Sequence, residues 1–361
     1  MASKRVSTFG VAATYIGTVV GAGFASGQEV LQFFGHFGLK GVPAIGVAVA
    51  LFSLYGYLIL ELGRKLGAKS HLPVVRAAGG RIVGTAVDAV ITFFLFGALV
   101  AMTAGAGAVL DEQFGLPSSV GNVLLVVATL LTVLAGIHGV VTAISLIVPA
   151  LLVAVVGISA ATLLHAPLNP STIGALDRAR APVPSWPLSA VVYVSYNIVL
   201  AVGVLAPLGA IAASPRALKL GAVLGGLGLG TGALAIQLAL LATLPQSARL
   251  EVPMIYIAGR FPALVQVGYS VVLLLEIYTT AVGNLYGFVA RIAKPRSPAF
   301  RWLVIATSAA ALLAGRLGFS SIVRTLYPAV GYAGLLLLLA LTYTLVHGLP
   351  KDSRSEGSGA A

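Results

Sequence analysis

Long apolar segments separated by short polar loops make up most of the chain. Crossing a bilayer as a helix takes about 20 predominantly apolar residues, and ten segments meet this length. Their ranges are 6–35, 43–63, 84–110, 120–137, 140–164, 187–213, 217–243, 261–290, 301–316 and 320–347. The pattern predicts an all-α, polytopic membrane protein with ten transmembrane helices in a lipid bilayer, followed by a disordered polar tail at 351–361.

The composition supports this prediction and sets the orientation. Of the 361 residues 58% are hydrophobic and only 9% are charged, whereas soluble proteins average about 25% charged residues. The net charge of +12 comes from basic residues in the loops, so we do not expect nucleic acid as a partner. Alternating the loops puts 15 of the 22 basic residues on one side, which predicts cytoplasmic termini in a bacterial cytoplasmic membrane.

The first segment contains an unusual group of small and polar residues. Gly17, Gly21 and Gly23 are followed by an amide and a carboxyl at Gln28 and Glu29. Each glycine costs a helix about 1 kcal/mol relative to alanine, and freed backbone in lipid is tolerated where it lines a cavity. The pattern predicts a discontinuous first helix. Close helix packing would also explain the first two glycines.

The chain repeats part of its own sequence. LAGIHG at 134–139 recurs as LAGRLG at 313–318, and Pro149 recurs at the same displacement of 179 residues as Pro328. The order of span lengths repeats as well. We therefore expect one transmembrane domain made of two five-helix repeats, 6–165 and 187–347. Because five spans is an odd number, the second repeat is inverted, and a site is expected near the bilayer midplane.

The eighth segment carries oxygen ligands on one helix face. Glu276, Thr279, Thr280 and Gly283 are spaced i, i+3, i+4 and i+7. Carboxylate and hydroxyl oxygens suit a hard cation such as Na⁺, and a charge at mid-membrane needs a partner or a cavity. Two other interpretations stay open: each threonine bonds a carbonyl one turn back, or Glu276 is a permanently protonated structural acid. Glu276 also suits loading and release of a proton.

With these residues the chain resembles the LeuT-fold transporters of the amino acid–polyamine–cation superfamily, and the stretch 17–29 resembles the YkvI-like membrane proteins. The resemblance implies that backbone carbonyls of Gly17 and Val20 bind sodium together with the hydroxyls of Thr279 and Thr280. The chain departs from the amino-acid symporters of that superfamily because it stops at ten spans and carries Glu276 where they have a small residue.

The break in span 1 and an expected break in span 6, around 197–203, supply the candidate cargo site. A half-helix starting near Phe24 exposes N–H groups to a carboxylate, and carbonyls near 17–21 face a cation. Glu29 gates an outer vestibule, attracts a cationic cargo or is solvated at the outer surface. The candidate substrate-binding residues are Gly21, Ala22, Gly23, Phe24, Ser26, Gln28, Phe96, Tyr196 and Asn197.

These features favour an ion-coupled symporter that moves a small polar solute, an amino acid or a related amine, by alternating access around a midplane site. The coupling ion is Na⁺ or H⁺, and no other cofactor is expected. A solute-sensing membrane receptor subunit of the same fold is the alternative. An enzyme is not expected, because no metal-ligand spacing, HExxH motif or nucleophile motif is present.

Overall fold

The computed structural model describes residues 6–135, 138–166, 168–169, 173 and 180–348. Eight helices of this part are long and apolar enough to cross a membrane, and the stretches 8–19 and 149–165 are shorter apolar helices. The predicted all-α membrane protein is therefore confirmed. Beyond the first span, the long helices are α4 Gly41–Leu66, α5 His71–Phe114, α6 Ser118–Ala135, α7 His138–His165, α9 Trp186–Ile211, α10 Pro215–Ala242, α12 Ala263–Ile292, α13 Pro298–Ala314 and α14 Phe319–His347.

The first span is broken into three short helices, as the glycines predict. These are α1 Thr8–Val19, α2 Ala22–Ala25 and α3 Gln28–Phe33. Val20 and Gly21 between the first two have extended backbones. The second interruption depends on Gly27, whose φ of 82° lies in the left-handed region that glycine adopts without steric cost. The second half of the span starts at Ala22, slightly earlier than the predicted start near Phe24.

The predicted break in the sixth span is wrong. The corresponding helix, α9, runs unbroken from Trp186 to Ile211, with Pro207 inside it. The side-chain amide of Asn197 donates to the carbonyl of Tyr193 at 3.0 Å, one turn back along the same helix. Asn197 is therefore satisfied by an intact helix, and Pro207 lies close enough to its end that the preceding turns keep their hydrogen bonds.

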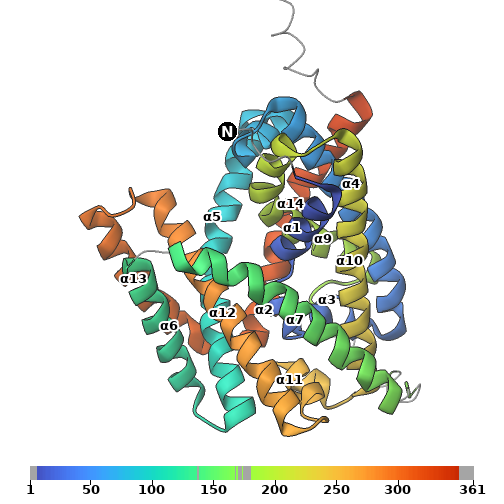
Figure 1. Cartoon of the computed structure of the whole chain (residues 1–361), viewed down its shortest axis with the longest axis vertical. Coiled ribbons are helices and arrows are strands. Elements are labelled where there is room, and N and C mark those ends of the chain that lie inside the picture. Colours follow the sequence, from blue (N-terminus) through green and yellow to red (C-terminus); the bar gives the residue numbers. More distant parts are fainter. Residues whose placement is uncertain (1–5, 136–137, 167, 170–172, 174–179, 349–361) are drawn as a thin grey trace, which may run out of the picture.

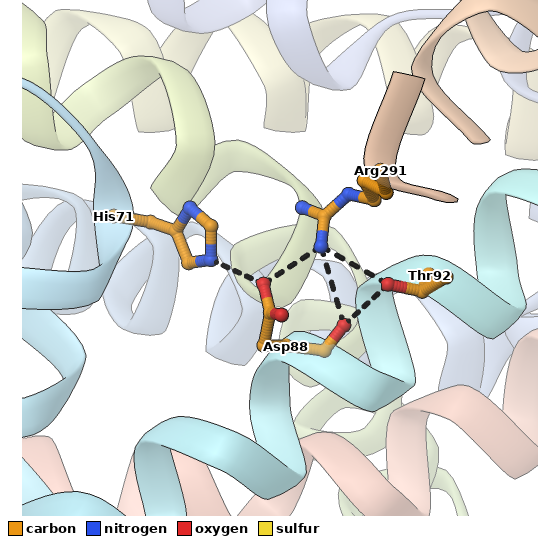
Figure 2. A network of polar contacts seen from close by, with 4 residues as sticks. All are labelled: His71, Asp88, Thr92 and Arg291. Carbon is orange, nitrogen blue, oxygen red and sulfur yellow. Dashed lines mark hydrogen bonds and ion pairs between the residues drawn. The ribbon is translucent and has the colours of Figure 1, made fainter. Parts of the chain in front are cut away.

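The third span begins with a separate helical segment. Gly80 inside α5 has φ 75°, so the chain turns there and the segment 71–79 is set off from the long helix that follows. Figure 2 shows the polar network that holds this corner. Asp88 Oδ1 lies 2.9 Å from His71 Nε2 and 2.7 Å from Arg291 Nη1, which also donates to Thr92 at 3.0 Å. The network fastens the last turn of α12 to α5.

The broken span lies against a glycine-rich helix. Four glycines of α10 recur about once per turn, and added Cβ atoms on them would meet α1 or α2: Gly221 faces Val11, Gly225 faces Tyr15, Gly228 faces Ile16 and Gly232 faces Phe24. Small residues of this kind let two membrane helices approach closely. Figure 1 shows α7 running obliquely across the bundle, where it packs against α10, α12 and α2. The break is thus enclosed from several sides.

The internal repeat stays a prediction. Pro149 and Pro328 both lie inside long helices, α7 and α14. The first copy of the glycine turn includes 136–137, which lie outside the described residues, as does the predicted disordered tail 351–361. A short helix that the sequence pattern did not predict, α11 Pro253–Ala258, connects α10 to α12.

Helices α4 and α9 cross closely enough to test the packing directly. A Cβ on Gly63 would overlap the carbonyl of Ala206, whereas a Cβ on Gly46 of the same helix meets nothing within 4 Å. We expect Gly63→Ala to lower the free energy of unfolding by about 1–3 kcal/mol, because the backbone of α9 must move. The matched variant Gly46→Ala is expected to be neutral or to stabilise by up to about 1 kcal/mol. Equal unfolding free energies in detergent micelles would contradict this crossing.

Candidate functional site

Backbone carbonyls that follow the break are hydrogen-bonded by other parts of the protein, whereas carbonyls that precede it are not. The hydroxyl of Tyr269 donates to the carbonyl of Ala25, and the N–H of Met254 donates to the carbonyl of Ser26 at 3.0 Å. In the described part of the chain, no hydrogen bond uses the carbonyl oxygens of Gly17 or Val20. The last turn of α1 therefore presents unpaired acceptors, which are suited to a cation.

Glu29 lies in the interior, and the prediction that it is solvated at the surface is wrong. Its residue is 5% exposed. The hydroxyl of Tyr196 on α9 donates to one carboxylate oxygen. A Cβ on Gly23 would overlap the other oxygen, so the carboxylate lies directly against the backbone of α2. The turn at Gly27 makes this possible, because it directs the first turn of α3 back over α2.

An aromatic cluster is centred on Tyr196, the hydrogen-bond partner of this carboxylate. The ring of Tyr196 lies 5.7 Å from Phe33, 6.3 Å from Phe94, 5.2 Å from Tyr327 and 5.6 Å from Tyr193, measured between ring centroids. These rings come from α3, α5, α9 and α14, and all five are buried. Aromatic faces beside a carboxylate attract a cation, because the ring quadrupole and the negative charge act in the same direction.

Glu276 on α12 is a second buried carboxyl group, with a residue exposure of 3%. Its Oε1 lies 3.4 Å from the hydroxyl of Thr280, and its Oε2 has no partner in the structure. The hydroxyl of Thr279 donates to the carbonyl of Glu276 at 3.1 Å, which is the bond one turn back considered above. That bond uses the hydroxyl proton and leaves the oxygen able to contact a cation.

The helix that carries Glu276 is joined to the broken span through Tyr269. Helices α1 and α12 run in opposite directions (Figure 1), and the bond between Tyr269 and Ala25 fixes their register. From Tyr269, seven residues of α12 advance about 10 Å to Glu276. From Ala25, the chain returns over a similar distance to Val20. No hydrogen bond among the described residues joins α1 to Thr279 or Thr280, so the shared sodium site stays a prediction.

Phe96, Phe24 and Asn197 have contacts that the sequence did not predict, and their role in binding stays a prediction. Phe96 packs against Phe288, with ring centroids 5.6 Å apart, and it is Phe94 that contacts Tyr196. Phe24 is buried against Gly232 of α10. Asn197 uses its amide inside α9. The remaining members of the predicted set, Gly21, Ala22, Gly23, Ser26, Gln28 and Tyr196, lie within or beside the break, and their role in binding stays a prediction.

Sequence reasoning missed most of the aromatic cluster. Tyr193 and Tyr196 are spaced one turn apart, and this spacing was a usable signal. Phe33, Phe94 and Tyr327 carry no such signal, because each stands among apolar neighbours on a different helix. Tyr269, whose hydroxyl satisfies the backbone of the break, likewise lies in an ordinary apolar segment. Only the three-dimensional packing brings these side chains together.

Comparisons with known proteins bear on the fold. No protein-family model matches the chain. The uncharacterized membrane protein YkvI of Bacillus subtilis (strain 168) is 29% identical over 341 residues, covering 94% of this chain and 97% of that protein. The uncharacterized protein YyaD of the same organism is 28% identical over 332 residues, covering 90% and 93%. The predicted resemblance to the YkvI-like membrane proteins is therefore confirmed.

Solved structures agree over most of the chain. MhsT in complex with L-phenylalanine matches with a TM-score of 0.60 at 16% identity, covering 93% of this chain and 89% of that one. A Na⁺-coupled sialic acid symporter matches with 0.59 at 13% identity, covering 97% and 92%. Mhp1, a nucleobase-cation-symport-1 family transporter, matches with 0.54 at 14% identity, covering 96% and 79%.

The chain adopts the LeuT fold. Within this LeuT fold, the broken first span of the chain is the segment that supplies the open carbonyls and positions Glu29. The unbroken α9 supplies Tyr196 as the facing partner. The site is therefore asymmetric: backbone on one side and an aromatic ring with a hydroxyl on the other.

The bond between Tyr196 and Glu29 is testable by a double-mutant cycle of Tyr196→Phe and Glu29→Gln. We expect a coupling free energy of about 1–3 kcal/mol in the free energy of unfolding, because the pair is buried and charge-assisted. Tyr193→Phe is the matched control, since Tyr193 lies in the same cluster without a hydrogen bond to Glu29. Equal coupling for both tyrosines would contradict a specific bond.

Proposed function

We propose that the protein is an ion-coupled secondary transporter that carries a small solute with a positively charged amino group. The observation that carries this proposal is the buried Glu29 carboxylate beside a helix break, in contact with Tyr196, on which an aromatic cluster is centred. Among the described residues Glu29 forms no ion pair. An amine bound there would neutralise a charge that is expensive to keep in the membrane interior.

The coupling ion would bind at a second position, between the end of α1 and the Glu276 face of α12. The open carbonyls of Gly17 and Val20, the carboxylate of Glu276 and the hydroxyls of Thr279 and Thr280 form a set of hard oxygen ligands, which suits Na⁺. If Glu276 carries a proton instead, the same position would couple transport to H⁺. Both possibilities use a carboxyl group whose Oε2 has no partner in the structure.

Alternating access supplies the mechanism. Irregular backbone at membrane depth is tolerated where it lines a cavity, and in transporters such segments bind substrate and coupling ion between two moving halves. The structurally similar proteins include a Na⁺-coupled sialic acid symporter and a nucleobase-cation-symport-1 family transporter, which supports transport as the function. With both termini in the cytoplasm, as the basic loops predict, the break would open alternately to the cytoplasm and to the outside.

Transport is tested with purified protein in liposomes. A thermal-shift screen of amino acids and small amines identifies a ligand, and its uptake is then measured under an imposed Na⁺ or pH gradient. We expect gradient-driven uptake by the wild type. Glu29→Gln should weaken amine binding by about 10- to 100-fold, because a hydrogen bond to a charged group contributes about 1.5–3 kcal/mol.

Glu29→Asp is the control, since it keeps the charge and should retain part of the binding. Amine binding that is unchanged in Glu29→Gln would refute the role of this carboxylate. If the wild-type protein binds the ligand but no flux is measured, the transporter hypothesis is refuted and the solute-sensing receptor is supported instead.

Sodium coupling is tested by heat stability. We expect Na⁺, compared with the same concentration of a large organic cation, to raise the melting temperature of the wild type, because a ligand that binds only the folded state stabilises it. The double variant Thr279→Ala with Thr280→Ala should lose most of this increase.

Thr231→Ala is the matched control, because Thr231 bonds a carbonyl one turn back on α10, away from the site. If Na⁺ raises the melting temperature of the double variant as much as that of the wild type, the proposed sodium site is refuted. In that case, loss of pH-dependent uptake in Glu276→Gln would identify proton coupling instead.

A further inference from the structure

A polar cavity of about 140 Å³ is lined by Gln28 and Gln32 of α3, and Glu29 is not among the residues that line it. It is found at the end of the bundle where α11 lies (Figure 1), because Arg249 and Leu250 in its wall directly precede that helix. Gln28 and Gln32 of α3 form the floor, one helical turn apart, while Glu29 between them points to the aromatic cluster. The wall is completed by His36, Arg180, Arg249, Ser320, Ser321 and Arg324.

The floor of this cavity contains unpaired hydrogen-bond acceptors. Gln28 is 1% exposed and Gln32 is 5% exposed. The amide oxygen of each has no hydrogen-bond partner in the structure. A buried acceptor without a partner costs about 1–3 kcal/mol, and native proteins leave few such groups. Both residues line the cavity, so a molecule bound there could offer their amides an N–H or O–H donor.

The rim of the cavity is positively charged. Arg249 and Arg324 are exposed and form no ion pair with any described residue. None of the described residues in the wall is acidic. Two carboxylates adjoin wall residues along the chain, and both are engaged: Glu251 accepts from the N–H of Phe319 at 2.6 Å, and Glu29 accepts from the hydroxyl of Tyr196.

The first turn of α14 adds to this charge. Ser320 and Ser321 occupy that turn, and their N–H groups have no partner in the described part of the chain. The N-terminus of a long helix carries a partial positive charge and unpaired donors, which favour an anion. Arginine side chains match the planar, bidentate geometry of a carboxylate.

We propose that this cavity binds a small carboxylate that also carries a hydroxyl or amino group. The carboxylate contacts Arg324, Arg249 and the start of α14, and the hydroxyl or amino group donates to Gln28 and Gln32. The site is distinct from the amine site, because Glu29 does not line this cavity and its carboxylate contacts Tyr196 and Gly23 instead. It stands or falls independently of the proposed transport function.

The test uses isothermal titration calorimetry with the full chain in phosphatidylcholine nanodiscs. L-Lactate is the main probe, because it has a carboxylate and a hydroxyl but no amino group for Glu29. Acetate lacks the donor, and ethylamine lacks the carboxylate. We expect lactate to bind at least tenfold more tightly than acetate, in the wild type and equally in Glu29→Gln. Arg324→Gln and Arg249→Gln should each weaken lactate binding at least tenfold.

Gln28→Leu tests the floor: it should reduce the preference for lactate over acetate while acetate binding stays the same. Arg260→Gln is the matched control, because Arg260 is an exposed arginine near the same end that does not line this cavity. Circular dichroism and size-exclusion profiles confirm that each variant is folded. The two arginine variants are independent, so failure of one to fold leaves the other.

Several outcomes would overturn the site. Absence of lactate binding, or lactate binding that is unchanged in both arginine variants, would refute carboxylate binding by this cavity. Equal affinity for acetate and lactate would refute the proposed hydrogen bonds from the ligand to Gln28 and Gln32. Loss of lactate binding when the nanodiscs contain phosphatidylglycerol would show that an anionic lipid headgroup occupies the cavity instead. Transport that fails while lactate still binds would refute the proposed function and leave this site intact.

Discussion

The structure depends on how an interrupted helix satisfies its backbone where water is scarce. In hydrocarbon each unpaired N–H or C=O costs several kcal/mol, so a broken helix needs partners from other parts of the protein. Here the side after the break is supplied by Tyr269, which bonds the carbonyl of Ala25, and by Met254, which bonds the carbonyl of Ser26. The side before the break, at Gly17 and Val20, is left open. In the proposed function, these open carbonyls form part of the binding surface.

Two buried carboxyl groups lie on either side of that surface, and neither has a basic partner among the described residues. Glu29 has a tyrosine hydroxyl, whereas Glu276 has only a distant threonine hydroxyl and one unpaired oxygen. A charge at the centre of a membrane helix costs about 3 kcal/mol on insertion scales. A cation or a proton bound at either group would lower this cost.

Helix α12 is fixed at both ends around Glu276. At one end Tyr269 bonds the broken span, and at the other Arg291 bonds Asp88 of α5 (Figure 2). A carboxyl group between two fixed points keeps its depth in the membrane while side chains around it rearrange.

The sequence predicted the fold well because its signals are local. Apolar length predicts each span, and the glycines at 17, 21 and 23 predict the break. Gly27 and Gly80 form turns, but the sequence alone does not distinguish such glycines from those that only allow helices to pack closely. The break expected in span 6 failed because it was inferred from symmetry, whereas Asn197 forms its bond within a continuous helix. The aromatic cluster was beyond prediction, because it joins residues of four helices that no periodicity relates.

The short helix α3 connects the two polar regions of the molecule. It has six residues, with a left-handed glycine at Gly27 before it and a non-helical residue, Phe34, after it. Glu29 contacts Tyr196, and Gln28 and Gln32 line the polar cavity. Because these side chains belong to one rigid turn of helix, a rotation about Gly27 that moves Glu29 away from Gly23 also moves both amides.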